Sequence, residues 1–195
     1  MRVVCYFDYT CAYSLRAWRW IETQVRGGEV DVDVEWRTFS LKEQNSAEGT
    51  SIFQEGAETS LSLLALALSH AARQHDFRSF HASVFETFHD PDHRTSTDRL
   101  WDIAEASGVD VQRFRGDRAD WIARVADEHR TAVTRYGVFG TPTLIFDKDV
   151  PVYLKMSRLP DSPAEGRRLW DALITLAVLH PEVLEMKRPV PVDGP

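Results

Sequence analysis

The sequence predicts an α/β fold in which a mixed β-sheet carries an inserted all-helical segment. Two observations lead to this class. The chain begins with a strand, helix, strand pattern, and strand-like runs return after Gly137. Between them, residues 57–136 show only the helical spacing of apolar side chains. We therefore expect one domain over residues 1–195, with residues 57–136 inserted into it as helices.

The first unit of the chain is a predicted βαβ motif. Residues 2–8 form a short apolar run rich in β-branched and aromatic side chains, as in a buried strand. Apolar residues then recur at helical spacing over 15–25, and Gly27 ends that helix. Over 30–36, valines and a tryptophan alternate with acidic residues, as in a half-buried strand. A right-handed crossover makes the two strands parallel, and such sheets bind ligands beyond the carboxyl ends of their strands.

The later elements follow from the same patterns. Residues 57–136 hold at least four helices, judged by the spacing of their apolar residues. The runs 143–146 and 150–154 predict a β-hairpin, which makes the sheet mixed. A last helix is expected over 163–180, before a loose tail that begins at Arg188.

The composition excludes several classes of protein. With 43% hydrophobic and 27% charged residues, the chain matches ordinary globular proteins. A formal net charge of −7 opposes phosphate backbones and anionic lipid, so we expect neither nucleic acid nor membrane as a partner. Asp8 interrupts the apolar start before a signal-peptide core forms, and two cysteines give no disulfide framework. These features predict a cytoplasmic protein.

The strongest chemical signal is Cys11, which lies where the first strand passes into the first helix. The unpaired N–H groups and partial positive charge of a helix N-terminus lower the pKa of a thiol below its usual ~8.5. The thiolate is the nucleophilic form. We therefore predict that Cys11 is a catalytic nucleophile, with a buried inert cysteine as the alternative.

The residues around Cys11 extend this candidate site. Ser14 stands one helical turn later, so its hydroxyl can donate a hydrogen bond to the thiolate, and it is the second predicted catalytic residue. Tyr13, between them, is expected to contact the substrate. Cys5 lies in mid-strand, where cysteine acts as a small hydrophobe, and the strand holds it too far from Cys11 for a relaxed disulfide.

The second signal is a Gly-Thr-Pro segment just ahead of a predicted strand, at residues 140–142. X-Pro bonds are the ones that adopt the cis form. A cis Pro142 would expose the backbone of Thr141 beside the thiol turn, where it could pair with an extended substrate. Alone this segment is only a turn, but together with the cysteine turn it predicts Thr141 and Pro142 as substrate-binding residues.

Together these motifs resemble the thioredoxin-like superfamily, and specifically its DsbA-like branch, over nearly the whole chain. The strand, Cys11 turn, helix, second strand, helical block and Gly-Thr-Pro segment occur in that family's order. The resemblance implies a thioredoxin-like fold, with Cys11 as the attacking cysteine and Pro142 as the cis proline. The family's usual motif is Cys-Pro-x-Cys, whereas here Ala12 and Ser14 replace the proline and the second cysteine.

This departure leaves three functions open. The first is a thiol–disulfide oxidoreductase that uses one cysteine in a Cys-x-x-Ser motif, with a low-molecular-weight thiol of the glutathione or mycothiol type as cosubstrate. The second function is that of a transferase or isomerase that activates a bound thiol. Its basis is the pattern of Asp8, Tyr13 and Ser14, which is similar to kappa-class glutathione transferases and hydroxychromene-carboxylate isomerases, although those usually have serine at the position of Cys11. The third is a non-catalytic scaffold that binds peptide beside Pro142.

Other polar residues give weaker signals. His89 and His93 flank two aspartates, but a polar loop between helices explains them, so no metal site is predicted. His70 and His75 are expected to be solvated. No tightly bound cofactor is expected, and the expected partner is a small-molecule thiol or disulfide. The sequence leaves the oligomeric state open, with a homodimer to be considered.

Overall fold

The sheet of this protein has four strands. The structure, a computed structural model, describes residues 1–54, 59–92, 94–180 and 182–187. The strands are β1 (Arg2–Phe7), β2 (Asp33–Thr38), β3 (Thr143–Phe146) and β4 (Val150–Tyr153). Their order is β2-β1-β3-β4, with β1 and β2 parallel and the other two pairs antiparallel. The predicted α/β class with a mixed sheet is confirmed.

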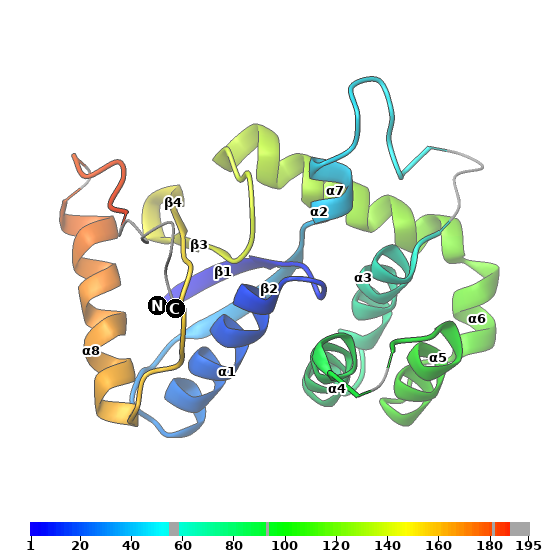
Figure 1. The fold of residues 1–195 in the computed structure, drawn as a ribbon, viewed down its shortest axis with the longest axis horizontal. Coiled ribbons are helices and arrows are strands. Elements are labelled where there is room, and N and C mark those ends of the chain that lie inside the picture. Colours follow the sequence, from blue (N-terminus) through cyan, green and yellow to red (C-terminus); the bar gives the residue numbers. More distant parts are fainter. Residues whose placement is uncertain (55–58, 93, 181, 188–195) are drawn as a thin grey trace.

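Helices cover the sheet and form the insertion (Figure 1). α1 joins β1 to β2, and α8 packs beside it, continuing into the π-helix η2. Figure 1 shows α3 to α6 gathered to one side of the sheet, while α7 runs back from them towards β3. The helical elements are α1 (Ala12–Arg26), α2 (Leu41–Gln44), α3 (Leu61–Ala72), α4 (Phe77–His89), α5 (Thr97–Ala106), α6 (Val111–Gly116), α7 (Arg118–Tyr136), the 3₁₀ turn η1 (Asp147–Asp149), α8 (Pro163–Ile174) and η2 (Thr175–Leu179).

The expected ends of the helical insertion and of the second strand agree only in part with the structure. The helices of the insertion run from Leu61 to Tyr136, and the expected first residue, 57, lies outside the described residues. The second strand was expected over 30–36, but β2 begins at Asp33. The reason is its partner, because β1 begins at Arg2 and Arg2 pairs with Asp33. Among the described helices, none is long and apolar enough to cross a membrane.

The central strand β1 is buried on both faces. Val3, Cys5 and Phe7 belong to the large core cluster that includes α1 and the insertion. Tyr6 points the other way, into a smaller cluster with Val138 of the loop after α7. This alternation follows from the two-residue period of a strand. Burial raises the pKa of the Cys5 thiol, which agrees with its predicted role as a core residue.

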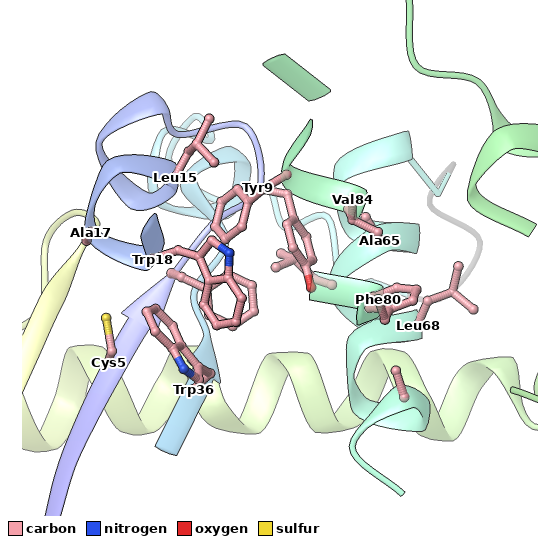
Figure 2. Packing of buried hydrophobic residues seen from close by; sticks show 14 of the residues in the cluster. Cys5, Tyr9, Leu15, Ala17, Trp18, Trp36, Ala65, Leu68, Phe80 and Val84 are labelled. Atoms are coloured by element: carbon pink, nitrogen blue, oxygen red, sulfur yellow. The ribbon is translucent and has the colours of Figure 1, made fainter. Parts of the chain in front are cut away.

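Aromatic side chains join the sheet to the insertion (Figure 2). The rings of Trp18 on α1 and Trp36 on β2 meet edge to face, with centroids 5.2 Å apart. Tyr9 contacts Phe85 of α4 in the same way, with centroids 4.9 Å apart. Such pairs add stability beyond the area that they bury. The insertion is therefore packed firmly against the turn that follows β1.

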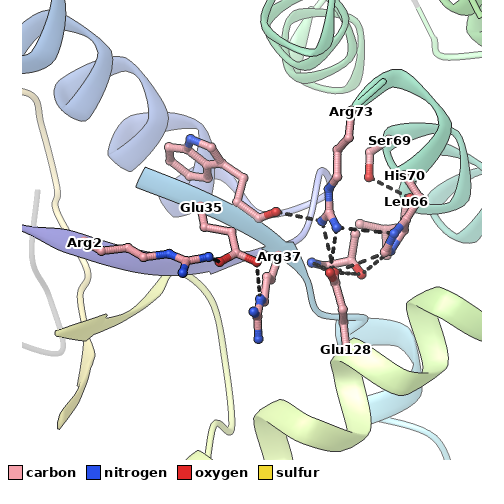
Figure 3. Close-up of polar contacts among 10 residues, drawn as sticks. Arg2, Glu35, Arg37, Leu66, Ser69, His70, Arg73 and Glu128 are labelled. Carbon is pink, nitrogen blue, oxygen red and sulfur yellow. Dashed lines mark hydrogen bonds and ion pairs between the residues drawn. The ribbon is translucent and has the colours of Figure 1, made fainter. Parts of the chain in front are cut away.

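A polar network joins the insertion to the end of β2 (Figure 3). The Glu128 carboxylate on α7 receives two hydrogen bonds from Arg73 of α3, at 2.6 and 3.0 Å, and two from the backbone and hydroxyl of Thr38. Arg73 also donates to the carbonyl oxygen of Trp36. Burial raises the pKa of Glu128, but Arg73 outweighs that effect and holds it below its usual value.

His70 belongs to this network, so the expectation that it is solvated is wrong. Its Nε2 lies 3.2 Å from the Thr38 hydroxyl and 3.4 Å from a Glu128 oxygen. Burial lowers the pKa of His70 to about 4, which keeps the ring neutral at pH 7. The apolar neighbours in its own helix gave no sign of these partners, which come from β2 and α7.

Candidate active site

Cys11 occupies the N-cap position of α1. Its backbone N–H donates to the carbonyl oxygen of Asp8 at 3.1 Å, which closes the turn between β1 and the helix. The side chain is 8% exposed. The first turn of α1 carries no acidic side chain, and its N–H groups have no partners within the helix. The thiol is therefore placed at the end of the helix that carries the partial positive charge of the helix dipole.

The loop that contains Pro142 faces this thiol. The peptide bond between Thr141 and Pro142 is cis. Cys11 Sγ donates to the carbonyl oxygen of Thr141 at 3.2 Å, across 130 positions of sequence. The Pro142 carbonyl accepts a hydrogen bond from Leu154 N–H at 3.0 Å, and Thr143 Oγ1 donates to Gly140 at 2.7 Å. Neighbouring strands thus hold the loop in place against the thiol.

Two buried hydroxyls belong to the same pair of segments. Ser14 is fully buried, and Thr141 is 2% exposed. Neither Ser14 Oγ nor Thr141 Oγ1 has a hydrogen-bond partner among the described residues. Such groups are costly to bury, so they commonly mark a place where another state or a ligand supplies the partner. Ser14 comes one helical turn after Cys11, so its hydroxyl is available to a thiolate there.

The Asp8 carboxylate stabilises the turn between β1 and α1 through hydrogen bonds. One carboxylate oxygen accepts hydrogen bonds from the backbone and hydroxyl of Thr10, at 2.8 and 2.7 Å. The other accepts from Leu41 N–H at 2.7 Å, at the start of α2. Burial raises the pKa of Asp8, and these hydrogen bonds oppose the rise. The turn that presents Cys11 is therefore tied to the segment that follows β2.

Two histidines of α4, for which the sequence motifs predict no place in the site, contact Tyr9. His89 Nε2 donates to the Tyr9 carbonyl oxygen at 2.9 Å, and the Tyr9 hydroxyl lies 2.8 Å from His81 Nδ1. Burial lowers the pKa of His89 and holds that of His81 well below its usual value. Tyr9 comes two residues before Cys11, so the insertion positions the thiol turn. No sequence signal links residues 72 and 80 positions apart.

Tyr13 lies at the edge of the site and is partly exposed. Arg16 of α1 and Lys155, which follows β4, both approach its ring, at 5.3 and 5.1 Å from the centroid. Cys11 is thus in contact with Thr141, to which Pro142 is joined by the cis bond, and Tyr13 and Ser14 lie in the first turn of the helix that Cys11 caps. Neither cation was singled out from the sequence.

No metal centre is seen in the described part of the chain. No three histidine, cysteine or acidic side chains there are grouped so that they could hold a metal ion. Of the histidine pair considered above, His89 belongs to α4 and binds Tyr9, and His93 lies outside the described residues.

A thiol at the N-terminus of a helix, facing a cis-proline loop on a mixed sheet with an inserted helical segment, defines the thioredoxin-like class. Within that class, the chain belongs to the DSBA-like thioredoxin domain family, whose family model matches residues 2–160. No curated protein matches the chain significantly.

Solved structures agree on the fold. A thioredoxin-like oxidoreductase from Silicibacter pomeroyi DSS-3 is 22% identical, with a TM-score of 0.57 over 88% of this chain and 83% of that one. A probable DsbA oxidoreductase from Streptomyces coelicolor is 19% identical, with a TM-score of 0.58 over 100% and 97%. The cytosolic disulfide reductase DsbM from Pseudomonas aeruginosa is 16% identical, with a TM-score of 0.61 over 91% and 100%, and has also been solved with GSH.

Proposed function

We propose that this protein is a thiol–disulfide oxidoreductase that works with one nucleophilic cysteine, Cys11, in a Cys-x-x-Ser motif. The observation that carries the proposal is the position of the Cys11 thiol, at a helix N-terminus and 3.2 Å from the Thr141 carbonyl oxygen. Membership of the DSBA-like family supports the reaction class. Ser14, Tyr13, Thr141 and Pro142 complete the proposed site.

The proposed reaction is a two-step exchange. The Cys11 thiolate attacks a disulfide R–S–S–R′, forms the mixed disulfide Cys11–S–S–R and releases R′–S⁻. A low-molecular-weight thiolate then attacks the sulfur of R, forms a new disulfide with it and releases the Cys11 thiolate. The Ser14 hydroxyl donates to the Cys11 thiolate before the first step and after the second. The Thr141 carbonyl, which accepts from the resting thiol, and the Tyr13 ring border the bound substrate.

The outside thiol is needed because the chain offers no resolving cysteine. Both cysteines are free, and Cys5 is fully buried in β1. Burial raises the pKa of Cys5, which keeps it protonated and unreactive. The solved complex of DsbM with GSH supports a glutathione-type thiol as the cosubstrate. The cytosolic source stated for DsbM supports the cytoplasm as the compartment.

The test is turnover of a small disulfide with glutathione as the reductant, followed in wild type, Cys11→Ser and the control Cys5→Ala. We expect Cys11→Ser to lose the activity and Cys5→Ala to keep it. Activity retained in Cys11→Ser would favour the kappa-like enzyme that activates a bound thiol. Absence of any thiol-dependent turnover in wild type would favour the peptide-binding scaffold.

A further inference from the structure

Two cations lie over one aromatic ring at the edge of the candidate site. The Arg16 guanidinium lies 5.3 Å and the Lys155 ammonium 5.1 Å from the centroid of the Tyr13 ring. Lys155 also lies 5.6 Å from the centroid of the Tyr153 ring. The Tyr153 side chain raises the pKa of Lys155 most, and Tyr13 and Cys11 add to that rise. Tyr13 lies in the first turn of α1, two residues after Cys11, so the two cations border the turn that presents the thiol.

These cations are not neutralised by the protein. Neither Arg16 nor Lys155 forms an ion pair with a carboxylate in the parts of the chain that the structure describes. Arg16 uses Nη1 to donate to the Met156 carbonyl oxygen at 3.1 Å, which leaves its charge uncompensated. Elsewhere on the surface, arginines pair with acidic side chains: Arg78 with Glu22, Arg130 with Asp127, Arg135 with Asp149, and Arg167 with Asp171.

The contrast with the whole chain makes this pair informative. The formal net charge of the protein is −7, whereas the two side chains beside the Tyr13 ring are both cationic. An apolar rim adjoins it, because the Phe139 side chain is 62% exposed and packs against Tyr153 with ring centroids 4.8 Å apart. Cations at a reaction site select anionic ligands and speed their approach.

We propose that Arg16 and Lys155 form a carboxylate-binding subsite for the thiol or disulfide that reacts at Cys11. This inference rests on the proposed oxidoreductase function and narrows its substrate class. The protein selects low-molecular-weight thiols that carry carboxylates, as glutathione does, over uncharged ones. Both cations contact the Tyr13 ring, and Arg16 is held in place by its hydrogen bond to the Met156 carbonyl oxygen.

The direct test compares two reagents that alkylate Cys11 by the same reaction. Iodoacetate carries a carboxylate and iodoacetamide does not, so the ratio of their rates reports the local charge and cancels any change in the fraction of thiolate. We expect Lys155→Met and Arg16→Met each to lower the iodoacetate-to-iodoacetamide ratio about three- to tenfold at low salt. The exposed Lys155 carries the test if Arg16→Met fails to fold.

The matched control is Arg26→Met, at the last residue of the same helix and about 15 Å further along its axis. It should leave the ratio unchanged. An unchanged ratio in Lys155→Met and in folded Arg16→Met would overturn the subsite. A fall of equal size in Arg26→Met would also overturn it, because a diffuse field would then explain the effect.

Turnover separates this inference from the proposed function. Lys155→Met should raise the KM for glutathione disulfide several-fold and leave that for the uncharged 2-hydroxyethyl disulfide unchanged. Equal changes for both disulfides would contradict the subsite while the oxidoreductase function stands. If wild type reduces neither disulfide but Lys155→Met still lowers the alkylation ratio, the anion subsite stands and the oxidoreductase function is refuted.

Discussion

Replacing Arg73 with methionine removes the cation that faces the largely buried Glu128 carboxylate. The Glu128 side chain is only 16% exposed, and it receives two of its hydrogen bonds from Arg73, at 2.6 and 3.0 Å. Breaking one side of a buried ion pair costs about 3–5 kcal/mol. Because both Thr38 donors remain, we expect the lower end, a loss of about 3 kcal/mol in the free energy of unfolding.

Urea denaturation at pH 7, followed by tryptophan fluorescence, measures this loss. The control Arg130→Met breaks an exposed pair with Asp127 and should cost under about 1 kcal/mol. The double variant Arg73→Met/Glu128→Gln should be more stable than Arg73→Met, because no unpaired carboxylate remains buried. A loss in Arg73→Met no larger than that of the control would refute this reasoning. So would losses in Arg73→Met and Glu128→Gln that sum to the loss in the double variant within about 0.5 kcal/mol.

Three further predictions concern the thiol, acid stability and helix packing. Ser14→Ala should slow the alkylation of Cys11 by iodoacetamide at pH 7, because the thiolate loses a hydrogen-bond donor, without lowering stability, because Oγ has no partner to lose; an unchanged alkylation rate would contradict the role of Ser14. Because the pKa of His70 falls from 6.5 in the unfolded chain to about 4 in the folded one, stability should be complete above pH 6.5 and decline by up to about 3 kcal/mol towards pH 4. Urea titrations across that range should show a smaller slope for His70→Gln, and an identical slope would argue against it. In Gly166→Ala, the added Cβ would overlap the buried side-chain amide of Gln24, so α8 should pack less well on α1 and the variant should lose about 1–3 kcal/mol in urea; an unchanged midpoint would show that Gln24 has room to move.

Local chemistry in the sequence was enough to predict where several of the candidate residues lie in the fold. The change from strand to helical spacing located the Cys11 turn, and the structure places that residue at the N-cap of α1. The apolar context of Cys5 predicted a core thiol, and it is fully buried. The Gly-Thr-Pro segment predicted a loop ahead of β3, and Thr141 lies there against the thiol. Each of these signals depends on residues close together in the chain.

Contacts between distant segments needed the folded chain. His81 and His89 reach Tyr9 only because α4 packs on the turn after β1, and sequence spacing carries no trace of that docking. The burial of His70 depends likewise on Thr38 and Glu128, which neighbouring elements supply.

The sequence by itself therefore determined the fold class, the order of its elements and the residue that carries the thiol, because periodicity and turn residues are local properties. The tertiary structure decided where β2 begins, through its register with β1. It also decided what surrounds Cys11, by bringing the carbonyl of Thr141 to its sulfur and Lys155 to the ring of Tyr13. Those contacts join residues more than a hundred positions apart, and only the packing of the sheet and its helices sets the distances between them.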